Sequence, residues 1–346
     1  METDQRSELG ERLEEGLRQK RQNLAVWLVT APAKDKKMRL GPASEQQVQD
    51  HIHVVDEILE RAASGSLGVC SICGDLVDAE LLEMDYTAQV CLDHFTPVEV
   101  RQLERELELS SVVQRALLPQ QAPDIPGLEV VAFSRAAQIV SGDFFDFVQL
   151  KDGTHGLVIA DVAGKGMSAS LIMASIQTAL RTLVPMATSP AHVLRDLNRL
   201  FAHNIRFNSF VTLFLGAYDA SSRTLTYCNS GHNPPLLLRN GDDRGFAFLD
   251  LNPTGAAIGL IENPRLRDET IQLLPGDLLL LYTDGLVEAF NPRGETYGVE
   301  RLTRVLRRNG DLPPQELVQG LWRELSGFAG GRPMSDDVTI IACRLE

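Results

Sequence analysis

The chain is short of positive charge and of long apolar runs, and each shortage excludes a class of protein. Its 33 Lys and Arg residues face 47 Asp and Glu residues, so the net charge is -14. Such an acidic chain is not expected to bind nucleic acid nonspecifically. The charged N-terminus lacks the apolar region of a signal peptide, and no apolar run looks long enough to span a membrane. We therefore expect a cytoplasmic protein with no membrane partner and no direct nucleic-acid partner.

Cysteine is also scarce. Five cysteines, an odd number, argue against a disulfide framework in a reducing compartment. Cys228 and Cys343 stand alone in apolar, strand-like runs, so we expect both to be small buried hydrophobic side chains. The length of 346 residues and an apolar content of 44% are enough for two domains and a sizeable core.

Four acidic turns stand beside apolar, strand-like runs. They are SGDFFDF (141–147), DVAGKG (161–166), YTDGLVEAF (282–290) and MSDDVTI (334–340). Several carboxylates meeting at one sheet edge would repel one another unless cations lay between them. Mg²⁺ and Mn²⁺ prefer oxygen ligands of this kind. One such sequence alone is more often an ordinary turn, but four on one domain predict an all-oxygen metal cluster.

The order of the motifs resembles that of the SpoIIE/RsbU-like bacterial serine phosphatases, a branch of the metal-dependent type-2C protein phosphatases. The motifs are SGDFFDF, DVAGKGMSASLIMA, SGHNPPLLL, TGAAIGL, GDLLLLYTDGLVEAFNPRGETYG and SDDVTIIACRL. The resemblance runs from about Leu107 to the C-terminus and departs at Ser141, where the family usually has Gly. Strands and helices come in blocks, which predicts an α+β fold. The resemblance implies two packed antiparallel sheets flanked by helices.

By this resemblance, two Mn²⁺ or Mg²⁺ ions would be held by four aspartates and one carbonyl oxygen. Asp161 would bridge the two ions, and Val162 would contribute its backbone carbonyl. Asp143 would serve one ion, directly or through water. Asp284 and Asp336 would hold the other.

Three further residues near these motifs have open roles. Asp337 adjoins Asp336 and is either an alternative ligand or a turn carboxylate. Asp146 lies one strand period and a residue beyond Asp143, so we expect it to point elsewhere. His232 stands beside a Pro-rich turn, where it is either a proton donor or, as is commoner, a structural histidine.

The implied activity is that of a protein serine/threonine phosphatase in bacterial signalling. Its substrate would be a phosphoserine or phosphothreonine regulatory protein, an anti-sigma-factor antagonist of the STAS type. The branch lacks the phosphate-binding Arg of many relatives, and Arg135 is the nearest candidate upstream of Asp143. The alternative is a protein that binds a transcription partner through its N-terminal part, with the phosphatase domain as a regulatory appendage. Ligands at all the acidic turns favour the enzyme.

The N-terminal part begins with two amphipathic patterns, Ser7 to Val29 and Glu45 to Ala63, with Ser44 as a plausible N-cap. They predict an antiparallel helical hairpin, unless each helix packs on the catalytic domain instead.

Two ligand pairs follow the second helix, Cys70-x2-Cys73 and Cys91-x2-His94, with 17 residues between them. This spacing predicts one structural, tetrahedral Zn²⁺. The segment also resembles the zinc finger of the DksA/TraR family, whose members bind RNA polymerase. His94 stands where that family commonly has Cys. We carry over the zinc and the hairpin, and leave RNA polymerase or a sensor as an open partner.

A helix from Thr96 to about Leu118 joins this module to the catalytic domain. Thr96, Pro97 and Glu99 form a capping-box start. Its end, SSVVQRALLP, resembles the switch helix that precedes RsbU-like catalytic domains, which is often paired in a homodimer. Its expected apolar stripe is Leu103, Leu107, Ser110, Val113 and Leu117. The sequence thus divides into a hairpin and zinc-finger module (1–95), a linker helix (96–118) and a phosphatase domain (119–346).

Overall fold

The computed structural model describes residues 14, 17–18, 21–22, 25–26, 28–29, 45–64, 66–75, 77, 89–164, 166–202, 210–240, 246–332 and 334–346. It forms two compact units, residues 1–106 and 107–346. The boundary falls inside helix α5 (Pro97–Leu117), so the sequence-based division at 95 and 118 stays a prediction.

The first unit contains the predicted pair of N-terminal helices. The described residues between 14 and 29 are helical, and α3 spans Glu45–Ala63 as expected. Leu17 packs with Val55 and Ile58, and Arg21 forms a 2.7 Å ion pair with Asp56. The two helices therefore pack against each other, as the hairpin requires. The loop between them and Ser44 lie outside the described residues.

Helix α5 starts with the predicted capping box. The backbone N–H of Glu99 donates to Thr96 Oγ1 (3.3 Å), and the backbone N–H of Thr96 donates to the Glu99 carboxylate (2.8 Å). These reciprocal bonds satisfy two donors that a helix start would otherwise leave unpaired. The hydrogen bonds that the Glu99 carboxylate accepts from the backbone N–H and the hydroxyl of Thr96 lower the pKa of Glu99.

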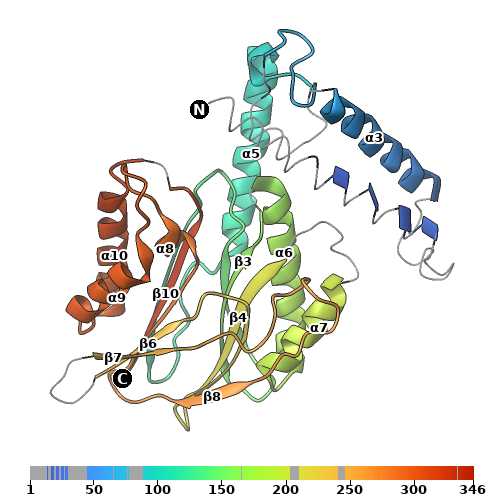
Figure 1. Cartoon of the computed structure of the whole chain (residues 1–346). Helices are drawn as coiled ribbons and strands as arrows, with labels where there is room; N and C mark the ends of the chain where they lie inside the picture. The colour runs from blue at the N-terminus through green and yellow to red at the C-terminus, as the bar shows by residue number, and fades with distance from the viewer. Residues whose placement is uncertain are drawn as a thin grey trace. The chain divides into compact units, whose positions relative to one another are not determined.

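The second unit is a sandwich of two five-stranded antiparallel sheets with helices over both outer faces (Figure 1). The first sheet has the order β1-β10-β9-β6-β7 and the second β2-β3-β4-β5-β8. The strands are β1 (Leu128–Arg135), β2 (Phe144–Gln149), β3 (His155–Val162), β4 (Val211–Asp219), β5 (Thr224–Ser230), β6 (Leu236–Asn240), β7 (Phe246–Asp250), β8 (Glu269–Gln272), β9 (Leu278–Tyr282) and β10 (Val338–Leu345).

Two groups of helices cover the sheets. Helices α6 (Gly166–Leu183) and α7 (Pro190–Ala202) lie over the second sheet, with the short helix η2 (Val184–Met186) between them. Helices α8 (Gly285–Glu288), α9 (Gly298–Asn309) and α10 (Pro314–Phe328) lie over the first. The predicted α+β architecture of two flanked antiparallel sheets is confirmed.

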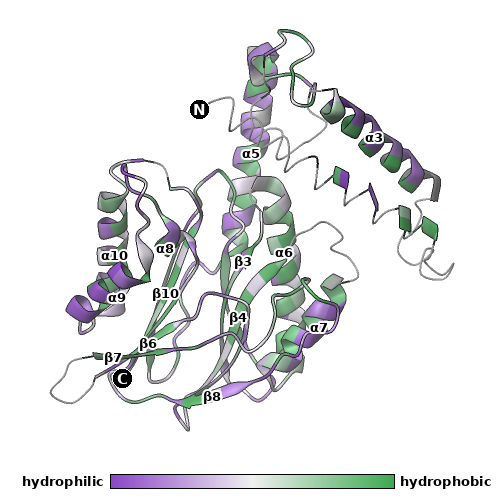
Figure 2. Ribbon diagram, viewed as in Figure 1, coloured by the Kyte–Doolittle hydropathy of each residue, from purple (hydrophilic) through white to green (hydrophobic). Residues whose placement is uncertain are grey.

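Four layers enclose three apolar interfaces, which explains why the central strands read as unbroken apolar runs. In β9, Leu278 and Leu280 face the α8–α10 layer, whereas Leu279 and Leu281 face the other sheet. All four are buried, and burying a leucine contributes roughly 1.5–3 kcal/mol. Figure 2 shows apolar residues concentrated along these strands and on the inner sides of the helices.

Two strands and one α-helix were not predicted from the sequence: β7, β8 and α8. Strands β7 and β8 are the outermost strands of their sheets, and most of their side chains are exposed or half-buried. Strand β8 has only four residues, and in β7 the exposed Ala247 and Leu249 are themselves apolar, so neither strand shows an alternating apolar and polar pattern. Helix α8 is a single turn within the YTDGLVEAF motif.

One negative expectation was wrong. The helical segment Gly166–Met186 is long and apolar enough, by composition, to cross a membrane, and 39% of it is buried inside the protein. Its apolar side chains serve the sandwich instead. Ala169, Met173, Ile176 and Leu180 lie in the interface with the second sheet.

Candidate metal centre

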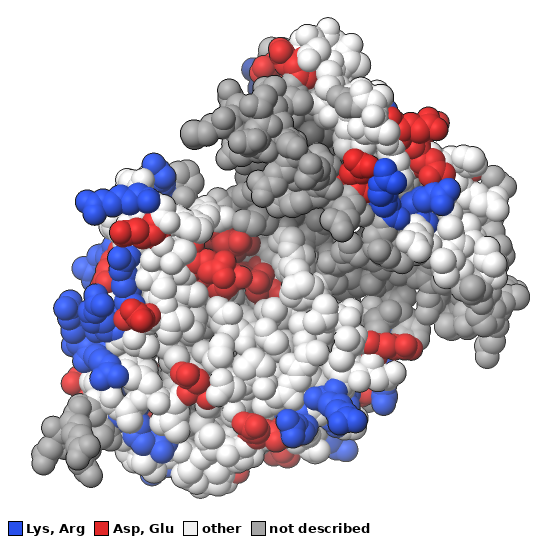
Figure 3. Space-filling model, in the orientation of Figure 1, with Lys and Arg blue, Asp and Glu red and all other residues white. Residues whose placement is uncertain are grey.

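The two sheets bring the four predicted aspartates to the same end of the sandwich. In the second sheet Phe144 pairs with Ala160, so Asp143 and Asp161 stand at neighbouring strand ends. In the first sheet Ile340 pairs with Tyr282. Asp284 follows β9 and Asp336 precedes β10, so these two residues also stand at neighbouring strand ends. Figure 3 shows acidic side chains gathered near the ends of β3 and β10.

Asp143 is the most buried of the four and connects the two sheets. Its side chain is 2% exposed, and it accepts a hydrogen bond from Thr283 Oγ1 (2.7 Å). Thr283 Oγ1 accepts in turn from the backbone N–H of Thr339 (2.9 Å). Burial holds the pKa of the Asp143 carboxyl well above its usual range, and the charge of Asp161 raises it further. Two carboxylates so placed favour a cation between them.

The turns that carry Asp284 and Asp336 lie in direct backbone contact. A Cβ added to Gly285 would lie 2.0 Å from the carbonyl oxygen of Asp337, so this position requires glycine. The backbone N–H of Thr283 also donates to Thr339 O (3.1 Å). These contacts fix the positions of both turns at the end of the first sheet.

Asp337 holds the loop between β1 and β2 in place. Its Oδ1 accepts from the backbone N–H of Ala137 (2.7 Å). Its Oδ2 accepts from Ser141 Oγ (2.8 Å) and from the backbone N–H of Gly142 (2.7 Å). Both oxygens are thus occupied by the segment that leads into Asp143. The sequence left Asp337 open between ligand and turn carboxylate, and these contacts favour the second role.

Gln114 of α5 fixes the same segment from another side. Its side-chain amide donates to the carbonyl of Ser141 (2.6 Å) and accepts from the backbone N–H of Ser141 (2.8 Å). Gln114 is buried, whereas Val113, expected on the packed stripe, is 54% exposed. That stripe was therefore partly wrong, because a polar residue makes the inward contact.

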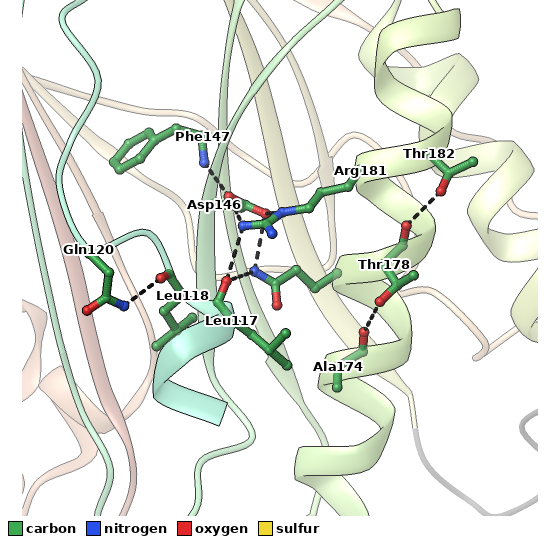
Figure 4. Close-up of polar contacts among 10 residues, drawn as sticks. Leu117, Leu118, Gln120, Asp146, Phe147, Ala174, Thr178, Arg181 and Thr182 are labelled. Atoms are coloured by element: carbon green, nitrogen blue, oxygen red, sulfur yellow. Dashed lines mark hydrogen bonds and ion pairs between the residues drawn. The ribbon is translucent and has the colours of Figure 1, made fainter. Parts of the chain in front are cut away.

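The Asp146 carboxylate points toward Arg181 of α6 (Figure 4). It forms a 2.7 Å ion pair with Arg181 of α6, and Gln177 donates to it at 3.2 Å. Gln177 and Arg181 also donate to the carbonyl of Leu117, at 2.7 and 3.1 Å. Asp146 thus holds Gln177 and Arg181 where both donate to a carbonyl at the C-terminal end of α5.

His232 is buried beneath the metal centre. Its Nδ1 lies 2.9 Å from Thr212 Oγ1, and Thr212 pairs with Asp161 across β3 and β4. Its backbone N–H donates to Asn229 Oδ1 (2.8 Å). Nε2 has no hydrogen-bond partner of ordinary geometry among the described residues. Burial lowers the pKa of His232 to about 4, and the backbone of Tyr282 offsets this only in part. These contacts favour the structural role.

The four aspartates do not crowd around one point. Among the described residues, no three Asp or Glu side chains have ligand oxygens within 4.8 Å of one another. Asp161, Asp284 and Asp336 are half-buried. The donor set is all oxygen and lies at the ends of buried strands, which fits hard divalent ions.

The first unit holds the predicted sulfur and nitrogen cluster. The ligand atoms of Cys70, Cys73, Cys91 and His94 all lie within 4.8 Å of one another. Cys73 Sγ and Cys91 Sγ are 3.7 Å apart. Two thiolates bound to one tetrahedral Zn²⁺ at about 2.3 Å would stand roughly 3.8 Å apart. This donor set therefore fits zinc in kind and in spacing.

Known proteins are similar to this chain in sequence and in fold. The family model described as stage II sporulation protein E (SpoIIE) matches residues 151–346. Phosphoserine phosphatase RsbU of Bacillus subtilis is 30% identical over 246 residues, which cover 70% of this chain and 71% of RsbU. Phosphoserine phosphatase RsbP of the same organism is 27% identical over 242 residues, which cover 69% of this chain and 57% of RsbP.

A solved structure supports the fold. The SiaA-PP2C domain of Pseudomonas aeruginosa superposes with a TM-score of 0.63 at 22% identity, over 72% of this chain and all of that domain. The family model covers more than half of this chain, and RsbU is matched over more than two thirds of both chains. The chain therefore belongs to the SpoIIE family and has a PP2C-like fold.

Proposed function

We propose that the protein is a metal-dependent protein serine/threonine phosphatase whose two Mn²⁺ or Mg²⁺ ions bind at the aspartate end of the sandwich. Asp161 would bridge the ions, with the carbonyl of Val162 beside it. Asp143 would serve one ion, and Asp284 and Asp336 the other. The observation that carries the proposal is the position of two carboxylate pairs, one from each sheet, at the same end of the sandwich.

Each part of the chain has a distinct task in this site. Bound ions would supply Lewis-acid chemistry for hydrolysis of a phosphate ester. Thr283 holds the Asp143 carboxylate at a fixed position. The glycines of DVAGKG, Gly164 with φ +114° and Gly166 with φ +70°, turn the chain sharply from β3 into α6. That turn leaves Asp161 and Val162 at the end of β3.

The substrate follows from the named relatives, both of which are phosphoserine phosphatases. We infer that it is a phosphoserine or phosphothreonine regulatory protein, with a STAS-type anti-sigma-factor antagonist as the first choice. We also infer that the protein acts in the cytoplasm. No feature of the matched relatives favours a transcription-partner binding protein instead.

Release of phosphate from a phosphoserine STAS-type protein in the presence of Mn²⁺ tests the activity. Asp161→Asn should abolish turnover and leave thermal unfolding in EDTA close to wild type, because it removes a bridging charge but little volume. Near wild-type turnover of this variant in saturating Mn²⁺ would show that Asp161 is not a ligand.

For the first unit we propose a structural Zn²⁺ on Cys70, Cys73, Cys91 and His94. The segment between the two pairs is too small for a core of its own, so the metal would stabilise it. RNA polymerase or a sensor protein stays the predicted partner of this module.

We further propose that α5 controls the metal centre, through packing or homodimer formation. Gln114 supports this, because it holds the backbone of Ser141, two residues before Asp143. A tenfold change in activity needs only about 1.4 kcal/mol of bias between two helix states.

A further inference from the structure

A groove runs along the outer edge of β1, beside helix α10. Its first part, about 270 Å³, is lined by the consecutive residues Val131, Ala132 and Phe133 and by α10 residues that include Trp322. Successive side chains of a strand point to opposite faces. Three neighbours can line one groove only if it follows the edge of the strand.

This edge of β1 is unpaired in the part of the chain that the structure describes. All eight residues of β1 pair with β10 on the other side, from Leu128 with Leu345 to Arg135 with Val338. An unpaired strand edge presents backbone N–H and C=O groups to any extended segment that reaches it. Peptide recognition by strand addition uses such an edge.

The groove leads to the metal centre. Its second part, about 320 Å³, shares Trp322 with the first and is lined also by Arg135, Ala137, Arg332 and Met334. The backbone N–H of Ala137 donates to Asp337, and Met334 stands two residues before Asp336. A segment that lies along β1 toward Arg135 would therefore arrive at the turn that carries Asp336.

The groove is basic although the whole chain has a net charge of -14. Figure 3 shows Lys and Arg side chains gathered on the α9 and α10 side of the molecule. The charged residues that line the groove are all arginines, Arg135, Arg323 and Arg332. The guanidinium of Arg135 lies over the Trp322 ring, 5.0 Å from its centre, which holds this exposed cation at the groove wall.

We propose that this groove binds the phosphoserine-bearing segment of an acidic protein substrate as an extra strand on β1. Arg135 and Arg332 would contact acidic groups that flank the phosphoserine. This inference rests on the proposed phosphatase function and adds the charge and conformation of its substrate. Arg135 is then a specificity residue, which recognises the flanks and takes no part in hydrolysis.

Binding of labelled phosphoserine peptides to the full-length Asp161→Asn chain tests the groove without turnover. Two peptides of equal length, one with acidic and one with basic flanks, are compared by fluorescence anisotropy at low salt. We expect the acidic peptide to bind at least tenfold more tightly, and this preference to fall as salt screens the arginines. Arg135→Gln should weaken acidic-peptide binding about fivefold, the size of one exposed charge contact.

Arg307→Gln is the matched control. Arg307 also stacks on an aromatic ring, 4.9 Å from the centre of Phe248, but at β7, the opposite edge of the same sheet. Its loss should leave the preference for the acidic peptide unchanged. An acidic peptide with alternate backbone amides N-methylated should bind at least tenfold more weakly than the unmodified one, because it cannot pair as a strand.

Equal binding of the two peptides would overturn the proposal, as would equal effects of Arg135→Gln and Arg307→Gln. Undiminished binding of the N-methylated peptide would do the same for strand addition. Selective binding of the acidic peptide, without its hydrolysis by the wild-type chain in Mn²⁺, would support the groove and overturn the proposed activity instead.

Discussion

Asp337→Ala separates the two roles that the sequence left open for this residue. The substitution removes three hydrogen bonds of 2.7–2.8 Å between a half-buried carboxylate and the loop from Ala137 to Gly142. The loop can relax toward water, so we take the typical net contribution of a hydrogen bond, about 1 kcal/mol, for each and about 3 kcal/mol in all. For a unit of this size that corresponds to a fall in Tm of roughly 6–12 °C.

Thermal unfolding in EDTA measures this loss without any contribution from bound ions. Asp219→Ala is the matched control, because Asp219 also accepts three hydrogen bonds of 2.7–2.8 Å. Those come from Ser221 and Ser222 in a local turn at the far end of β4, away from the metal centre. Asp219→Ala should leave the Mn²⁺ dependence of turnover unchanged. Asp336→Asn should raise the Mn²⁺ requirement sharply with little effect on unfolding in EDTA.

A particular result would refute the anchor role. If Asp337→Ala unfolds like the wild type in EDTA but needs as much extra Mn²⁺ as Asp336→Asn, then Asp337 is a metal ligand. If it loses stability and its Mn²⁺ requirement rises only modestly, the carboxylate acts by positioning the segment before Asp143.

Three other predictions concern separate parts of the molecule. Metal analysis of the wild type should find roughly one zinc per chain. Cys73→Ser should lose this zinc and keep its turnover of a small phosphate ester. Wild-type protein that is purified without chelator and contains no zinc would exclude the site. Gln114→Leu and Leu107→Glu should each change turnover several-fold at unchanged fold, and wild-type rates and Mn²⁺ dependence in both would make α5 a passive tether. Burial lowers the pKa of His232 to about 4, so between about pH 6.5 and pH 4 the imidazole is protonated in the unfolded chain but not in the folded one. Over this range, denaturant unfolding should show a loss of about 3 kcal/mol of stability in the wild type that His232→Gln lacks. Parallel profiles of stability against pH for the two proteins would contradict the lowered pKa.

Much of the fold could be predicted because its central strands are buried on both faces. Runs such as LLLLY and, within β3, GLVIA are apolar without interruption, and both lie in strands between two apolar layers. Strands β7 and β8 could not be found in this way, because they lie at sheet edges with few buried side chains. A strand buried on one face is marked by alternating apolar and polar residues, and neither FAFLD of β7 nor ETIQ of β8 shows this alternation.

The candidate site could also be predicted only in part. Asp143, Asp161, Asp284 and Asp336 could be proposed because each stands in a motif beside a strand. The positioning contacts could not. Gln114 binds a residue 27 positions away, and Asp337 binds residues about 200 positions away. Nothing local to either residue encodes its partner, so only the folded chain shows which acidic side chain anchors a loop.

The bond between Thr283 and Asp143 has a thermodynamic consequence for the whole sandwich. It joins two sheets that each supply two of the four proposed aspartate ligands, so neither sheet alone could form the complete proposed site. Ion binding and sheet association are then linked, and each must strengthen the other. Mn²⁺ at a hundredfold excess over its Kd would stabilise the folded unit by about 2.7 kcal/mol. Chelation would act on the cohesion of the two sheets as well as on catalysis.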